Sequence, residues 1–231
     1  MPDLDFQVTG VDPSIRSVSP SLGFRVRITN SPPDEKIEAV LLNAQIQLQP
    51  AQRKYNEREQ EKLVELFGAP ENWGQTLRNR LWTNSSVTIN GFSGETETIL
   101  PVACTYDLNL AATKYFYALE GDEVSLLFLF SGSIFYRTAD GRLQVSRISW
   151  NKECSYRMPA QSWHEVMERH YPNTAWVTVQ RDVFERLCEY KRRRAIPTWE
   201  EAFSRLLQTA EAHDDSIESA AVPAAKMEAV A

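Results

Sequence analysis

The amino-acid sequence predicts an α+β protein built around an antiparallel β-sandwich or a strongly bent sheet. Strand patterns precede helix patterns along the chain, without the regular alternation of a parallel βαβ fold. We expect one α+β domain over residues 1–212, with a helical insertion at about 55–81 and C-terminal helices at about 159–212 packed on the sheet. Residues 213–231 lack aromatic residues and a sustained apolar pattern, which predicts a flexible tail.

The strands are indicated by side chains that alternate between apolar and polar, the period of a strand with one buried face. This pattern covers residues 22–29 and 40–49. The segment NSPPDEK between them contains two prolines and polar turn residues, so we expect the two strands to form an antiparallel hairpin. Residues 124–136 predict a central strand, and Asp140 with Gly141 predicts a second hairpin turn after it.

The helices are indicated by a change of period after Pro50. From about residue 56, NEREQEKLVELFG is charged and places three apolar side chains at helical spacing before the glycine. Near the C-terminus, Thr198 with Glu201 resembles the capping box that starts a helix. An apolar stripe follows, made of Trp199, Ala202, Phe203, Leu206, Leu207 and Ala210.

Composition excludes several classes of function. The chain has 231 residues, with 25 Lys and Arg against 31 Asp and Glu and a net charge of −6, so a general nucleic-acid binder is disfavoured. The most apolar run, residues 126–130, is far shorter than the ~20 residues that span a bilayer. The N-terminal MPDLDF lacks the basic start of a signal peptide, and three scattered cysteines fit a reducing compartment. We therefore expect a cytoplasmic protein.

The segment WHEVMERH contains the most suggestive polar residues, yet it fails as a zinc-protease motif. HExxH requires a second histidine where this chain has Glu168. His164 and Glu168 remain weak metal-ligand candidates on one helix face, although a solvated helix surface explains them more simply. Cys154 could join them in an enzyme site assembled from distant residues. The sequence contains no glycine-rich phosphate loop, and we predict no cofactor and no catalytic residue.

Partner-binding candidates come from basic and aromatic residues. Residues 191–194 form the one basic run, Lys191, Arg192, Arg193 and Arg194. This run predicts contact with RNA or an acidic partner, or alternatively cations at the end of a helix, where the helix dipole favours them. Arg25 and Arg27 lie on the polar face of a predicted strand and could extend a basic patch. Trp82 and Trp163 are candidate interface anchors, with core packing as the alternative.

Several long segments resemble a family of uncharacterised bacterial proteins, a domain of unknown function. They are LGFRVRITN, VLLNAQIQLQP, LVELFGAPENWGQTLRNRLWTNSSVTINGF, LPVACTYDLNLAATKYFYALEGDEVSLLFLFSG and RAIPTWEEAFSRLL, within residues 1–210. Members of this family are encoded near uptake NiFe hydrogenase genes. The resemblance implies an accessory role in hydrogenase maturation or assembly, with hydrogenase subunits or maturation factors as partners. It transfers no catalytic residue.

These observations rank three hypotheses. The first is a non-enzymatic accessory or interaction protein, a chaperone or scaffold, because the chain has neither a CxxC pair nor a His-rich tract for delivering metal. The second is an enzyme with a site around His164, Glu168 and Cys154. The third is a binder of RNA or an acidic partner through Lys191–Arg194.

Overall fold

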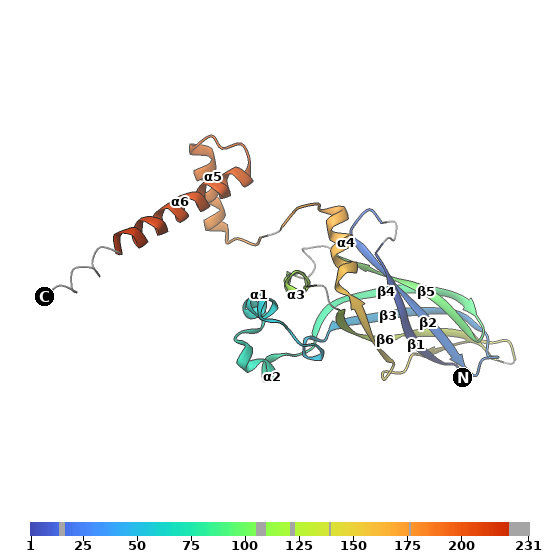
Figure 1. Ribbon diagram of the computed structural model, residues 1–231. Coiled ribbons are helices and arrows are strands. Elements are labelled where there is room, and N and C mark those ends of the chain that lie inside the picture. Colours follow the sequence, from blue (N-terminus) through green and yellow to red (C-terminus); the bar gives the residue numbers. More distant parts are fainter. Residues whose placement is uncertain (14–16, 105–109, 121–122, 139, 176, 222–231) are drawn as a thin grey trace. The chain divides into compact units, whose positions relative to one another are not determined.

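A computed structural model describes residues 1–13, 17–104, 110–120, 123–138, 140–175 and 177–221 of the chain (Figure 1). The chain divides into two compact units, residues 1–175 and 176–231. This division differs from the single domain expected over residues 1–212.

The first unit is a β-sandwich of two antiparallel sheets, which confirms the predicted α+β class (Figure 1). Sheet A has the order β1–β2–β5, with β1 (Asp3–Asp12), β2 (Ser21–Ser31) and β5 (Glu95–Ala103). Sheet B has the order β4–β3–β6–β7, and β8 also pairs with β6. Its strands are β3 (Ile37–Leu48), β4 (Arg80–Phe92), β6 (Glu123–Arg137), β7 (Leu143–Arg147) and β8 (Glu153–Pro159).

The core lies between the two sheets. Alternate side chains of β2 and β3 are fully buried, as their sequence period predicts. Phe24 of sheet A packs edge to face on Phe128 of sheet B, with ring centroids 5.1 Å apart. Phe6 stacks on Phe130 at 4.5 Å. Burial of this apolar surface supplies the main favourable free energy of folding.

The prediction that β2 and β3 form a hairpin is wrong. β2 pairs with β1 and β5, whereas β3 pairs with β4 and β6, so the chain changes sheets between them. Both strands bury one apolar face, and two such faces can meet across a sandwich as well as side by side in one sheet. The amide of Asn30 donates to the carbonyl oxygens of Pro32 and Glu35, each at 3.0 Å, and fixes the crossing segment.

Two sides of the sandwich bring strands of different sheets together. β1 lies against β8, where the backbone N–H of Val8 donates to Cys154 Sγ at 3.4 Å and Lys152 pairs with Asp3 at 3.0 Å. β4 lies against β5, and the Ser85 hydroxyl donates to the Pro101 carbonyl oxygen. These contacts cover four strands that would otherwise be sheet edges.

The helices of the first unit gather beside the ends of several strands (Figure 1). The helical insertion expected at about 55–81 contains α1 and α2 and ends where β4 begins. The remaining helices are α3 and α4, and α4 packs on the sandwich against β2 and β8. The bounds are η1 (Pro50–Gln52), α1 (Glu57–Phe67), η2 (Pro70–Asn72), α2 (Trp73–Thr76), α3 (Leu110–Ala118) and α4 (Ala160–His170).

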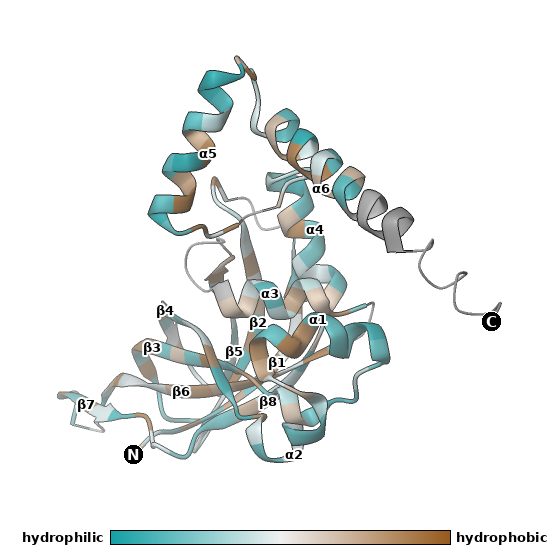
Figure 2. Cartoon of the chain, turned by 90° about the vertical axis from the view of Figure 1, so that its left-hand side faces the viewer, coloured by the Kyte–Doolittle hydropathy of each residue, from teal (hydrophilic) through white to brown (hydrophobic). Residues whose placement is uncertain are grey.

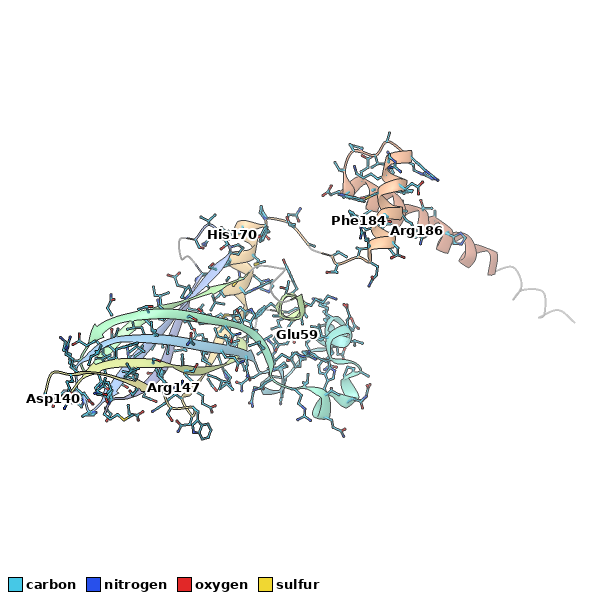
Figure 3. The ribbon with its side chains drawn as sticks, turned by 180° about the vertical axis from the view of Figure 1, so that it is seen from behind. Glu59, Asp140, Arg147, His170, Phe184 and Arg186 are labelled. Carbon is cyan, nitrogen blue, oxygen red and sulfur yellow. The ribbon has the colours of Figure 1, made fainter. Side chains whose placement is uncertain are left out.

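A buried ion pair joins α1 to the segments around it. Arg53 donates to Glu59 Oε1 at 2.7 Å, and the two side chains are only 7% and 2% exposed. The same oxygen accepts the backbone N–H of Glu120 at 3.0 Å, while Glu59 Oε2 accepts that of Asn56 at 3.1 Å and completes a capping box. One carboxylate therefore ties the helix start to the segment that follows α3 (Figure 3).

The second unit is a helical hairpin of α5 (Arg181–Arg193) and α6 (Trp199–Ala221). The Trp199 ring lies 5.5 Å from that of Phe184 and 5.9 Å from that of Phe203. Helix α6 continues to Ala221, which corrects the flexible tail expected from residue 213. The helix continues there without an apolar stripe, so the end of the stripe does not mark the end of the helix. Residues 222–231 of the expected tail lie outside the described part of the chain.

Glu59→Ala should lower the free energy of unfolding by about 3–5 kcal/mol, because it leaves the Arg53 guanidinium buried without its carboxylate and removes a helix cap. Urea denaturation followed by circular dichroism measures this change. Glu57→Ala, on the exposed face of the same helix turn, is the matched control and should cost far less. Equal costs for the two variants would contradict a structural role for the ion pair.

Candidate interaction surface

The outward face of sheet B carries a row of apolar side chains at its β7 end. In the register between β6 and β7, Val145 lies opposite Phe135, Leu143 opposite Arg137, and Arg147 opposite Ser133. The next strand places Leu41 opposite Ser133. Because alternate residues of a strand share a face, these side chains all point away from the core.

Four of these residues form what we call the β7 patch: Leu41, Phe135, Leu143 and Val145. Leu143 is 55% exposed, Val145 57% and Leu41 46%, while Phe135 is half-buried. Single exposed apolar residues are common on proteins, whereas neighbours on one sheet face are a feature of binding surfaces.

Trp150 lies beside this strand in the turn between β7 and β8, and its side chain is 94% exposed. Two backbone hydrogen bonds hold the ends of this turn. Ile148 donates to the Gly132 carbonyl oxygen at 3.1 Å, and Phe130 donates to that of Lys152 at 2.8 Å. The residues between these bonds leave the ladder, which places a tryptophan in solvent on a turn with fixed ends.

The charges beside β7 are mainly basic. Arg137 pairs with Glu38 at 3.3 Å, and Arg142 pairs with Asp140. Arg147 has no ion-pair partner among the described residues. Figure 3 labels Asp140 at the tip of the β6–β7 hairpin and Arg147 further along the sheet. An approaching carboxylate would therefore find an uncompensated guanidinium at this strand.

Strand β7 also contains a buried hydroxyl that lacks a hydrogen bond. Ser146 points into the sandwich opposite Ile134 and is only 8% exposed. Its Oγ has no hydrogen-bond partner within the described part of the chain. A buried polar atom without a partner costs free energy, so this residue weakens the attachment of β7.

His164 and Glu168, the candidate metal ligands, both make contacts within the protein. His164 is half-buried beside the Tyr117 and Trp163 rings and hydrogen-bonds the backbone of Leu119 and Phe116. Burial lowers the pKa of His164, and these hydrogen bonds partly oppose the shift. Glu168 accepts the backbone N–H of Asn173 at 3.1 Å, just beyond the end of α4.

No described contact joins Cys154 to His164. His164 lines an open hollow with Tyr117 and Glu168, and Cys154 is not part of its lining. The Cys154 sulfur instead accepts the Val8 N–H at the seam between β8 and β1. Among the described residues, no three His, Cys, Asp or Glu side chains are placed to hold a metal ion.

Trp82 and Trp163 belong to the core, which corrects their assignment as interface anchors. They are 6% and 2% exposed, and both pack on the Phe116 ring, at 5.0 and 5.1 Å. Tryptophan is common both in hydrophobic cores and at protein interfaces, so the residue type alone does not show which of the two a tryptophan occupies. Trp150 ends a segment whose pattern indicates a strand, but that pattern does not show which of its apolar side chains are exposed.

The predicted basic residues do not form one described patch. Arg25 and Arg27 lie on the outward face of sheet A in the first unit, where Arg27 faces Glu97 across the strands. The run Lys191–Arg194 belongs to the second unit. Lys191 donates to the Pro197 carbonyl oxygen at 2.8 Å.

The other basic side chains of this run also have local contacts. Arg193 pairs with Glu189 on the same helix, and Arg194 lies 5.0 Å over the Tyr190 ring. Arg192 is exposed. The run thus mainly stabilises the C-terminal end of α5, as expected for cations beside the negative end of a helix dipole.

The first unit is thus an α+β sandwich protein with an exposed apolar strand at one sheet edge. A family of unknown function, DUF6084, matches residues 1–215, and the chain belongs to this family. The predicted kinship with an uncharacterised domain is confirmed. None of the curated proteins matches the chain significantly. None of the described helices has the length and apolar character to cross a membrane.

Two solved structures show a distant likeness. They are a β-glucosidase from Kluyveromyces marxianus and β-glucosidase 3B from Thermotoga neapolitana, each 10% identical with a TM-score of 0.23. The matches cover 68% of this chain but 15% and 17% of those proteins. A TM-score this low supports no inference about fold or function.

Ser146→Ala should raise the free energy of unfolding by about 1 kcal/mol, because it removes a buried hydroxyl that has no hydrogen-bond partner. Urea denaturation measures the gain. Ser155→Ala on the outward face of β8 is the control and should change stability by less than about 0.5 kcal/mol. A loss of stability in Ser146→Ala would show that the hydroxyl is satisfied in solution.

Proposed function

We propose that this protein is a non-enzymatic accessory protein that binds a protein partner through the β7 patch and Trp150. The main support for this proposal is that Leu143, Val145 and Trp150 are all exposed beside one sheet edge, with Trp150 94% exposed. Tryptophan is enriched among the residues that contribute most to binding free energy. Fully burying an aliphatic side chain contributes roughly 1.5–3 kcal/mol, which rewards a partner that covers this surface.

More specifically, we propose that the protein is a chaperone or scaffold in hydrogenase maturation or assembly. It would act in the cytoplasm on hydrogenase subunits or maturation factors. This proposal is supported by the resemblance of several long segments to proteins encoded near uptake NiFe hydrogenase genes. A scaffold needs a surface that holds another protein, and the β7 patch offers one. The engaged positions of His164, Glu168 and Lys191 leave the enzyme and RNA-binding alternatives without a specific supporting contact.

Affinity purification of the tagged full chain from its native cells tests this function. Hydrogenase subunits or maturation factors should co-purify with the wild type, and their recovery should fall at least about tenfold in the double variant Val145→Lys with Trp150→Ala. Ile99→Lys is the matched control, because Ile99 is 50% exposed on a strand of the other sheet. Equal recovery by all three proteins would contradict the proposal.

A further inference from the structure

Within the described part of the chain, β7 has one edge that no other strand covers. β7 pairs with β6 on one side, and no strand within the described residues pairs with its other side (Figure 2). The remaining edge strands lie against one another, β1 against β8 and β4 against β5. An open edge presents unpaired backbone N–H and C=O groups, which form a template for another strand.

We propose that β7 binds an extended segment of a partner protein, which adds to sheet B as an antiparallel strand. This inference rests on the proposed function and names the chemistry of its partner. The segment carries an acidic residue, then an apolar residue two positions later, then another apolar residue two positions after that. Main-chain hydrogen bonds give such a complex its affinity, and alternate side chains give it specificity.

The register of β7 dictates this pattern. Leu143, Val145 and Arg147 alternate along the strand and share the outward face of sheet B. An antiparallel neighbour meets Arg147 first, then Val145, then Leu143. Residues directly opposite each other in such a pair have Cβ atoms about 4.5–5.5 Å apart, close enough for a carboxylate to reach Arg147 and for apolar side chains to cover the other two.

Charge favours a foreign segment over a second copy of this chain. Two β7 strands paired antiparallel about Val145 would place Arg147 of each copy opposite Leu143 of the other, so neither guanidinium would gain a carboxylate. The nearby carboxylates of Glu38 and Asp140 already pair with Arg137 and Arg142 and offer little compensation. A charge opposite an apolar side chain gains no ion pair, whereas an acidic residue opposite Arg147 forms an opposite-charge pair, which stabilises a strand pair.

The length of the added strand is also set by the fold. β7 spans Leu143–Arg147, five residues, and the turn that carries Trp150 follows it. A bound segment therefore gains its main-chain pairing over about five residues. Such a short pairing gives modest affinity by itself, and Trp150 at its end offers further apolar contact.

Two fluorescent peptides test the proposal against the full chain, Thr-Glu-Thr-Val-Thr-Val-Thr and the same peptide with lysine in place of glutamate. Fluorescence anisotropy should show the glutamate peptide binding about fivefold more tightly than the lysine peptide. Arg147→Glu should reverse this preference. Arg27→Glu on sheet A is the matched control and should leave the preference unchanged. Equal affinities for the wild type, or no binding by either peptide at millimolar concentration, overturns the proposal.

Backbone pairing is tested separately with two N-methylated glutamate peptides. Alternate residues of a strand direct their N–H groups to opposite edges, so methyl groups on one alternate set should abolish binding and those on the other set should not. Equal binding of both peptides overturns strand addition. If strand addition fails while the Val145→Lys and Trp150→Ala variant still loses its cellular partner, the accessory function stands and only its mode is refuted. Concentration-dependent dimers of the free chain, abolished by Val145→Lys because two lysines would then face each other, would assign the edge to a second copy.

Discussion

Contact between the two sheets along their sides, which shields strand edges, is the constraint on which the rest of this fold depends. Sheet A has three strands and sheet B has five, and each open sheet has strands at its edges. Sheet A and sheet B meet along their sides, which covers most of these edge strands. The seam between β1 and β8 depends on the Val8 N–H bond to Cys154 and on the pairing of Asp3 with Lys152. With these edges covered, the apolar faces of both sheets remain packed on each other.

Strand β6 explains why one edge escapes this closure. It is the longest strand, and β8 pairs with its first half while β7 pairs with its second half. Between the halves lies Gly132, whose φ of +144° suits glycine, and whose Cβ, if present, would collide with the Leu41 carbonyl oxygen. The turn bearing Trp150 leaves the ladder at this point and separates β8, which lies against β1, from β7.

Much of this architecture follows from the sequence, because strand and helix periods reflect which side chains are buried. The alternation in residues 22–29 and 40–49 predicted β2 and β3, but it could not say whether two apolar faces meet within one sheet or across a sandwich. Trp82 and Trp150 are the same residue type, and only the tertiary packing separates the core residue from the exposed one. The Arg53–Glu59 pair likewise could not be predicted, because Arg53 lies in a loop and the apolar–polar periodicity of the sequence does not describe loops.

Native-state hydrogen exchange by NMR on the full chain, without any partner, tests the central claim most directly. Amides of β7 that point away from β6 should exchange among the fastest of all strand amides, whereas β1 and β8 amides beside their seam should exchange slowly. Slow exchange of every β7 amide, at the rate of the β8 amides, would contradict the account, because it would mean that the edge of β7 is already covered.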